Sequence, residues 1–489
     1  MSRKPAPAQW IPHRMRRLLW TPLAQRPGAG AAPGTAAGSA VPAVLHIAVR
    51  IGELLLAGGQ GAEDVEAVML GVTHAYHLPD CEPQVTFTMI SVSWQAGPDA
   101  VPITVDRTVR HRESDYRRLT GVYGLVDDIL NERATPAQAR ARLDVISALP
   151  PLYPAAVIAA ATGGIAASAS VLVSGRSDAR AALTFLVAFA AAVVGDRLAA
   201  VLAAWRSPPF YRSAVAAVPA AAAGVVMALA GIGLGGSAVV TGSLFALFPG
   251  KALVGAVEDG LTGFYLTAAA RLVEVLYLVT GIITGVLAVL PLGVRLGAVF
   301  PPVGGLGGGQ QNVVLHIAAA MVLAVCLAAV LQTPAGILPY TAVGGGIAWG
   351  VFHLLSSPLS LNPIFATGAG ACAGGLFGQL AARSRHLYSL PYVTGALGPL
   401  LPGSLLYTGV LALVEGRGAD GLANLSRAAA TALALAVGVN IGSGLPRIAQ
   451  LGTSRLPELR SRPRRRRRGG TDDAGLQEPG RSRVSDVER

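Results

Sequence analysis

Five ionisable residues lie close together between Thr241 and Gly285, inside or beside two apolar segments. They are Lys251, Glu258, Asp259, Arg271 and Glu274. Each apolar segment is about long enough to cross a bilayer. Ionisable groups at that depth are costly, so they tend to face a bundle interior or a water-filled path. These side chains are therefore the first candidates for binding a charged solute or for carrying a proton.

The spacing of three of these polar residues places them on one helix face. If the second segment is helical, Thr267, Arg271 and Glu274 stand at i, i+4 and i+7. Gly281 and Gly285 extend that face as a pair of small residues, which lets a neighbouring helix approach closely. Such a polar stripe is typical of a substrate path. The alternative is a structural ion pair between Arg271 and Glu274 that locks two helices.

The composition is that of a membrane protein. The chain has 489 residues, of which 52% are hydrophobic and 13% charged, and its mean hydropathy is +0.52. These values exclude a disordered protein and are unusual for a soluble one. Cys81, Cys326 and Cys372 are far apart and predict neither a disulfide framework nor a zinc site. We expect no cofactor, and the chain has no GxxxxGK[ST] pattern that would indicate ATP binding.

The net charge of +12 arises largely from a basic run near the C-terminus, where eight arginines lie between Arg455 and Arg468. A basic run after a last membrane span fixes topology and contacts anionic lipid. Nucleic-acid binding is the alternative. We do not favour it, because no structured element accompanies the run.

The first 150 residues predict a tail and a small soluble domain. Residues 1–40 have the composition of a disordered tail and lack the apolar core of a signal peptide. Residues 42–150 predict a cytoplasmic α/β domain. Its expected elements are helices at 41–56, 63–76, 115–131 and 136–149, with Thr135 as an N-cap, and strands at 82–94 and 101–110 joined as a hairpin.

Hydropathy from residue 152 onward predicts about ten membrane spans. We place them near 152–174, 181–203, 213–232, 237–257, 261–291, 313–332, 335–355, 359–380, 388–413 and 421–445. This division gives a first transmembrane half at 151–292, a linker at 293–312, a second half at 313–445 and a disordered basic tail at 446–489. The predicted fold is therefore a polytopic α-helical membrane protein preceded by a small α/β domain.

An even number of spans places both termini on one side of the membrane. The basic tail and the arginines of the soluble domain predict that this side is cytoplasmic. These domain arginines are Arg107, Arg110, Arg112, Arg117 and Arg118. Arg176, Arg180, Arg295 and Arg417 then fall on the opposite side. We expect a multi-pass protein of the cytoplasmic membrane, with a homo-oligomer as an open possibility.

The two predicted halves share an internal similarity. The segment from Thr241 through Phe248-Pro249-Gly250 matches that from Thr394 through Leu401-Pro402-Gly403 at a constant offset. A glycine pair follows in each half. Two halves of five spans must have opposite orientations, which is the inverted-repeat plan of many secondary transporters, whose sites lie at helix breaks in matching positions. Chance similarity between glycine-rich helices is the alternative.

Two regions give the chain a family resemblance. One is RIGELLLAGGQGAEDVEAVM with the strand QVTFTMISVS, within residues 50–93; the other is EDGLTGFYLTAAARLVE with TGALGPLLPGSLLYTGV, at 258–274 and 394–410. In these regions the sequence resembles the threonine/serine exporter family. The resemblance covers roughly residues 42–445. It implies export of small hydroxy amino acids driven by the proton motive force, and it links some relatives to dicarboxylate export.

The ionisable residues suit a zwitterionic substrate such as threonine or serine. Asp259 or Glu274 can accept from the ammonium group, and Arg271 can donate to the carboxylate. Backbone N–H groups at a helix end near Gly260 and Gly263 are alternative donors. The full set of predicted substrate-binding residues is Asp259, Gly260, Thr262, Gly263, Thr267, Arg271, Glu274, Pro402 and Gly403.

Proton coupling requires a carboxylate that can hold a proton in a dry site. The candidates are Glu274, Asp259 and Glu258. Glu274 is the first choice, because Asp259 could instead cap a helix that begins at Leu261.

Three other functions remain as alternatives to a threonine/serine exporter. A dicarboxylate exporter would need more fixed positive charge in the path than Arg271 and Lys251 offer. A membrane-bound hydrolase would use Glu53, His74 and nearby carboxylates of the soluble domain, although their spacing fits no ligand set and no nucleophile is paired with a base. An uncoupled channel would move solute only down its own gradient.

Overall fold

The computed structural model describes residues 19, 41–97, 99–110, 112, 115–175, 178–301, 312–384, 388–395 and 397–460. The predicted N-terminal tail, except Leu19, and the part of the predicted C-terminal tail after residue 460 lie outside these residues. Part of the linker predicted at 293–312 also lies outside them.

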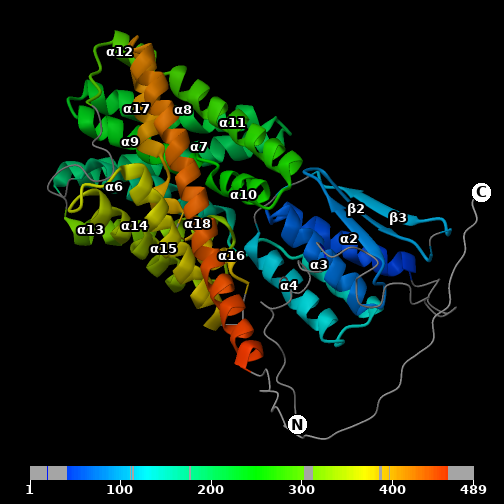
Figure 1. Cartoon of the computed structure of the whole chain (residues 1–489). Coiled ribbons are helices and arrows are strands. Elements are labelled where there is room, and N and C mark those ends of the chain that lie inside the picture. The colour runs from blue at the N-terminus through cyan, green and yellow to red at the C-terminus, as the bar shows by residue number, and fades with distance from the viewer. Residues whose placement is uncertain are drawn as a thin grey trace, which may run out of the picture. The chain divides into compact units, whose positions relative to one another are not determined.

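The N-terminal domain combines helices with a three-stranded sheet (Figure 1). Its elements are α2 (Val41–Ala57), α3 (Ala62–Ala75), β1 (Cys81–Val85), β2 (Met89–Trp94), β3 (Ile103–Thr108), α4 (Tyr116–Leu130) and α5 (Pro136–Ser147). The strands are antiparallel in the order β1-β2-β3. Alternate residues of β2 are buried, as expected of a strand with one face on a core. Ile51, Leu55, Met69, Ile90 and Tyr116 belong to that core.

The predicted elements of this domain are largely confirmed. Thr135 caps α5, accepts a hydrogen bond from the Gln138 N–H group and forms a full capping box. The predicted hairpin is present as β2 and β3. The single strand predicted at 82–94 is wrong, because this segment turns back after Val85 and forms β1 and β2. Thr86 stabilises the turn by donating from its N–H group to the Met89 carbonyl, at 2.8 Å. The turn contains neither Gly nor Pro, and its β-branched residues favour strands, so no signal in the sequence indicated a turn here.

The rest of the described chain forms a bundle of apolar helices. They are α6 (Ala155–Ser174), α7 (Ala179–Ala204), α8 (Pro209–Leu229), α9 (Gly233–Leu247), α10 (Gly250–Leu261), α11 (Tyr265–Leu287), α12 (Leu290–Arg295), α13 (Val313–Val330), η3 (Ala335–Ile337), α14 (Leu338–Ser356), α15 (Pro363–Ser384), α16 (Leu390–Thr394), η4 (Gly398–Leu400), α17 (Gly403–Val414) and α18 (Gly418–Arg460). Helix α18 continues past residue 446, where the tail was predicted to begin.

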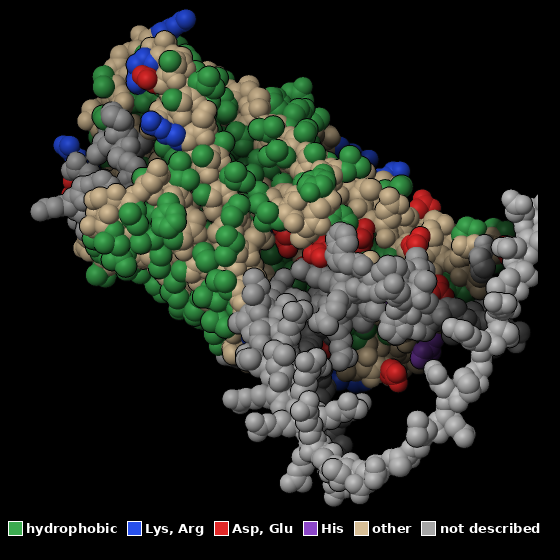
Figure 2. Space-filling view, viewed as in Figure 1, with side chains coloured by type: hydrophobic (Ala, Val, Ile, Leu, Met, Phe, Trp, Pro, Cys, Tyr) green, Lys and Arg blue, Asp and Glu red, His purple; other side chains and the backbone are tan. Residues whose placement is uncertain are grey.

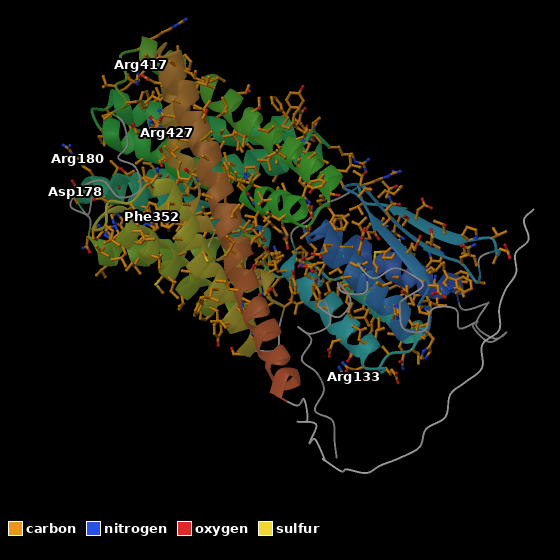
Figure 3. The ribbon with its side chains drawn as sticks, viewed as in Figure 1. Arg133, Asp178, Arg180, Phe352, Arg417 and Arg427 are labelled. Atoms are coloured by element: carbon orange, nitrogen blue, oxygen red, sulfur yellow. The ribbon has the colours of Figure 1, made fainter. Side chains whose placement is uncertain are left out.

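Ten spans are confirmed if one bent helix pair counts as a single span. Among the described residues, nine helices are long and apolar enough to cross a membrane. The pair formed by α9 and α10 bends by 49° and supplies the tenth. The visible face of the bundle is covered mainly by hydrophobic side chains (Figure 2). Arg180 and Arg417 lie at the end of the bundle remote from Arg133, which stands between α4 and α5 (Figure 3).

The two similar segments form the same backbone structure. Pro249 has φ −79° and ψ 54°, and Pro402 has φ −81° and ψ 40°. The residue after each proline donates its N–H to the carbonyl of the residue before it, at 2.8 Å for Gly250 and 2.9 Å for Gly403. Both sites are therefore inverse γ-turns, and each begins a new helix. The prediction that both prolines break helices is confirmed.

The two breaks also pack against each other. A Cβ atom on Gly250 would lie 2.7 Å from Leu401 Cδ2, and one on Gly403 would collide with the Phe245 ring. Each glycine therefore makes room for a side chain from the opposite half. The matching breaks of the two halves meet inside one hydrophobic core, which includes Phe245 and Leu401.

The predicted glycine pairs lie at close helix contacts in both halves. A Cβ atom on Gly281 or Gly285 would meet the backbone carbonyls of Phe210 or Ala214 in α8. In the second half, a Cβ atom on Gly438 would meet the carbonyl of Gly368, and one on Gly442 would meet that of Cys372, both in α15. The last span of each half thus packs closely on the third span of the same half, as small-residue seams allow.

These contacts predict the effect of enlarging one seam glycine. Gly442→Leu should destabilise the bundle by about 1–3 kcal/mol, because the side chain meets backbone that cannot rotate away. Gly444→Leu is the matched control on the same helix, since no atom lies within 4 Å of a Cβ atom there. Thermal unfolding of the purified proteins in detergent should give a lower Tm for Gly442→Leu alone. Equal Tm values for the two variants would contradict the close packing of α18 on α15 at Gly442.

Candidate functional site

The ionisable residues lie on a helical hairpin made of α10 and α11. Lys251 lies in the first turn of α10 and Asp259 in its last turn. The chain then turns through Gly263, whose φ of +89° favours glycine, and α11 returns alongside α10. This return brings Arg271 to Asp259, with Nε 3.1 Å from Oδ2. The two side chains are 6% and 0% exposed, so the site holds a buried ion pair.

The N-terminal domain completes this ion pair. The loop of Gly58, Gly59, Gln60 and Gly61, which we call the GGQG loop, joins α2 to α3. At its end the Ala62 N–H group donates to Asp259 Oδ1 at 2.7 Å. Arg271 Nη2 donates to the Gln60 carbonyl at 2.5 Å. The carboxylate therefore lies at the N-terminus of α3, where the helix dipole favours negative charge.

Lys251 is held by the same loop. Its Nζ donates to the Gly58 carbonyl and lies 4.6 Å from the centre of the Tyr116 ring, a cation–π geometry. The Tyr116 hydroxyl is 2.8 Å from Thr394 Oγ1, in the segment before the second helix break. Burial raises the pKa of Tyr116 above its usual value, so the phenol remains a neutral partner. Polar contacts thus connect α10, the N-terminal domain and the second half.

Glycine is required where the loop passes the charged side chains. Gly59 has φ +91°, and a Cβ atom there would lie 2.8 Å from Lys251 Nζ. A Cβ atom on Gly61 would lie 3.2 Å from Glu258 Cδ. Absence of side chains lets the loop backbone approach the charges, and positive φ adds a second reason at Gly59.

Glu274 lies outside the buried pair. Its side chain is 38% exposed and its Oε2 is 3.2 Å from Nη1 of Arg112, a residue of the N-terminal domain. Arg112 also lies over the Phe87 ring. Burial lowers the pKa of Arg112, and the Glu274 charge opposes that shift. The alternative of an Arg271–Glu274 ion pair is wrong, since Arg271 pairs with Asp259 and Glu274 with Arg112.

Two expectations about the turn after α10 are also wrong. No helix begins at Leu261, so Asp259 is not its cap; α10 ends there and α11 begins at Tyr265. The N–H groups of the turn are already used: Thr262 donates to Glu258, Gly263 to Gly260 and Phe264 to Asp259. The N–H that meets Asp259 comes instead from Ala62.

The remaining predicted residues lie near the hairpin or at the second break. Thr267 is 2% exposed on α11, one turn before Arg271. Thr262 Oγ1 donates to the Glu258 carbonyl at 3.0 Å. Gly260 lies in the last turn of α10. Pro402 and Gly403 lie at the break before α17.

The sequence did not identify the GGQG loop as part of this site. Its glycines indicated only a break between helices. The contact between Ala62 and Asp259 joins residues 197 positions apart, which no local pattern predicts. The available signal was physical: a buried carboxylate and two buried cations require partners, and the loop offers unpaired backbone groups next to a helix N-terminus.

Three of the basic residues that were used to predict a cytoplasmic N-terminal domain form ion pairs with carboxylates. Arg107 pairs with Glu53 at 2.5 Å, Arg112 with Glu274 and Arg118 with Asp115. In the part of the chain that the structure describes, no three His, Cys, Asp or Glu residues converge as a metal site would require.

Glu66 is the acid of the N-terminal domain with a large change in pKa. Burial raises its pKa to about 7, against a hydrogen bond from the Val85 N–H group at 2.8 Å. It lines a cavity of about 390 Å³ that also includes Phe264 from the turn between α10 and α11.

The fold and the site together define a class of protein. The chain is a multi-pass membrane protein with an α/β N-terminal domain, and it has two similar halves that meet at broken helices beside a buried charge pair. The family model described as "Putative threonine/serine exporter" matches residues 46–293. The model described as "Threonine/Serine exporter, ThrE" matches residues 316–444. The chain belongs to the threonine/serine exporter family.

Two curated proteins are similar over most of the chain. A protein of Mycobacterium tuberculosis named "Probable threonine/serine exporter" is 31% identical over 423 residues, which cover 85% of this chain and 79% of that protein. A "Threonine/serine exporter" of Corynebacterium glutamicum is 27% identical over 420 residues, covering 84% and 83% respectively. No solved structure matches the chain significantly.

The loop contacts predict how Asp259 affects the N-terminal domain. In Asp259→Ala, the amides from Gly59 to Val65 should exchange hydrogen at least about tenfold faster, because a charge-assisted hydrogen bond is lost. Hydrogen exchange with mass spectrometry on the purified protein measures this. Glu274→Gln is the control, since Glu274 touches Arg112 and not the loop. Unchanged loop exchange in Asp259→Ala would show that the loop is held by other contacts.

The raised pKa of Glu66 predicts a pH dependence of stability. The folded domain holds this proton more tightly than the unfolded chain, so the stability it contributes is present below pH 4.5 and is lost as pH rises through about 7. The full effect is at most about 3 kcal/mol. The fall in Tm between pH 5 and pH 8 should be smaller in Glu66→Gln than in the wild type. Glu82→Gln, an exposed glutamate of the same cavity, should behave as wild type; an unchanged slope in Glu66→Gln would refute the assignment.

Proposed function

We propose that this protein exports threonine and serine across the cytoplasmic membrane, and that Asp259 and Arg271 bind the amino-acid backbone of the substrate. Family membership supports the substrate class, because both curated relatives are named for threonine and serine. The observation that carries the site is the buried Asp259–Arg271 pair, whose remaining hydrogen bonds come from a loop of another domain.

The GGQG loop and the first residue of α3 offer the site the same kinds of hydrogen-bonding group as the substrate that they would exclude. The Ala62 N–H group donates to Asp259, as the substrate ammonium would. The carbonyls of Gln60 and Gly58 accept from Arg271 and Lys251, as the substrate carboxylate would. The loop therefore stabilises a closed site without substrate. Withdrawal of the loop leaves a carboxylate acceptor and two cationic donors that fit a zwitterion.

Other predicted residues would surround the bound amino acid. Thr267 is the proposed partner for the substrate hydroxyl, because it lies on the same face of α11 as Arg271. Thr262 is second, since its hydroxyl already donates to the α10 backbone but can still accept. Gly260, Gly263, Pro402 and Gly403 would shape the ends of the path through the turn after α10 and the break before α17.

The balance of charge favours a zwitterion over a dicarboxylate. Lys251, Arg271 and Arg112 are three cations at the junction of the two domains. Glu258, Asp259 and Glu274 bring an equal number of carboxylates to the same hairpin. A dicarboxylate site would need a surplus of cations, whereas an amino acid carries no net charge.

Proton antiport would use one of the three carboxylates. Asp259 and Glu274 both have partners in the N-terminal domain, so withdrawal of that domain removes a donor or cation from each. A carboxylate that loses such a partner in a dry site binds a proton more readily. Glu274 is the first residue to test, with Asp259 and Glu258 as the other candidates.

Threonine uptake into everted membrane vesicles tests the site. Wild-type vesicles should accumulate threonine when a proton gradient is imposed. Arg271→Gln should reduce uptake at least about tenfold, since a buried charge pair is broken and a substrate contact is lost. Arg197→Gln is the control, because this membrane arginine pairs with its neighbour Asp196 away from the site.

The same vesicles separate coupling from binding. If Glu274 carries the proton, Glu274→Gln should still exchange labelled threonine across the membrane but should lose accumulation driven by the gradient. Full accumulation in Glu274→Gln would move coupling to Asp259 or Glu258. Uptake of succinate instead of threonine by the wild type would replace the proposed substrate with a dicarboxylate. Immunoblots establish that each variant is present in the membrane.

A further inference from the structure

A second cavity lies in the N-terminal domain, apart from the Asp259–Arg271 pair, and charged residues form part of its lining. Its volume is about 370 Å³, which is within the range of small-molecule sites. It is bounded by the end of α2, the end of β3, the start of α4 and the end of α5. Its charged lining residues are Arg50, Glu53, Arg110, Asp115 and Arg118.

The carboxylates of this cavity already have partners. Glu53 Oε2 lies 2.5 Å from Arg107 Nε. Asp115 caps α4 by accepting from the Arg118 N–H group at 3.0 Å, and it pairs with the Arg118 guanidinium. Glu53 Oε2 also lies 3.9 Å from Arg50 Nη1, a longer second ion pair. Arg50 and Arg110 are the two remaining arginines of the wall.

Those two arginines have donors to spare. Arg50 Nη2 donates to Ser147 Oγ at 3.2 Å, but its buried Nε has no hydrogen-bond partner within the described structure. Arg110 is exposed, and no ion pair to it occurs among the described residues. A planar guanidinium matches a carboxylate with two parallel hydrogen bonds. The wall therefore offers donors for an anion.

We propose that this cavity binds a small carboxylate-bearing molecule of amino-acid size, held by Arg110 and Arg50. The carboxylate of the ligand takes the donors of these arginines. An α-ammonium group, where the ligand has one, faces the oxygens of Glu53 and Asp115 on the same wall. Threonine and a dicarboxylate such as succinate share the required carboxylate, and the ammonium distinguishes them.

The cavity shares a residue with the loop that closes the proposed transport site. Gly58 lines the cavity, and its carbonyl accepts the hydrogen bond from Lys251. Asp115 also lines it and directly precedes Tyr116, whose ring holds the Lys251 ammonium. A ligand bound in the cavity would therefore lie next to Gly58, the residue whose carbonyl holds Lys251, and would change how firmly the loop is held. This coupling rests on the proposed function, whereas ligand binding does not.

Calorimetric titration of threonine and of succinate into full-length protein in lipid nanodiscs tests the site. The measurement uses an Arg271→Gln background, which weakens the proposed transport site and changes no residue that lines the cavity. Adding Arg110→Gln should weaken binding by about tenfold or more, the effect of losing a charge-assisted hydrogen bond. Arg110→Lys keeps the charge but not the two parallel hydrogen bonds, so its affinity should lie between those of the background protein and Arg110→Gln. Arg140→Gln, which removes an exposed arginine of α5 outside the cavity, should change nothing.

The outcomes separate this proposal from the transport site. Binding of either ligand that depends on Arg110 supports the cavity, and the better ligand identifies the class. The proposal is overturned if neither ligand binds in the Arg271→Gln background. It is equally overturned if binding is the same with Arg110→Gln as with Arg140→Gln. Loss of vesicle uptake in Arg271→Gln with either of these results would leave the transport site standing and remove only the cavity.

Discussion

A carboxylate and a guanidinium buried together in an apolar bundle are stable only if their other hydrogen bonds are satisfied. The N-terminal domain supplies such hydrogen bonds to both side chains: Gln60 of the GGQG loop accepts from Arg271, and Ala62, the first residue of α3, donates to Asp259 Oδ1. The N-terminal domain is thus the polar complement of a charge pair that α10 and α11 cannot satisfy alone. This constraint explains the glycines of the loop, since side chains there would keep the backbone away from the charges.

The same region joins the two halves of the bundle. The inverse γ-turns at Pro249 and Pro402 start α10 and α17 and pack against each other through Gly250 and Gly403. The contacts from Lys251 through Tyr116 to Thr394 connect the first half to the second by way of the N-terminal domain. Movement of that domain would therefore act on both halves. A transporter needs such a connection if one domain is to open a path between two repeats.

The features predicted from the sequence are those with local causes. Apolar blocks placed the spans, Pro249 and Pro402 marked the breaks, and Thr135 marked the start of α5. The turn at Thr86 was missed because its residues favour strands. The partners of Arg271 and Glu274 in the N-terminal domain were missed for a different reason. Helical spacing shows which side chains share a face, but Gln60 and Arg112 lie 211 and 162 positions away in the sequence. A buried charge predicts that a partner exists without predicting which segment supplies it.

The central claim is that the GGQG loop must leave Asp259 and Arg271 before substrate can pass. A reversible disulfide between Gly61→Cys and Glu258→Cys, with the native cysteines replaced, tests it most directly, because a Cβ atom on Gly61 would lie 3.5 Å from Glu258 Cγ. Oxidation should stop threonine uptake into everted vesicles and reduction should restore it, while each single-cysteine variant should ignore the oxidant. Undiminished uptake by the fully cross-linked protein would contradict the account.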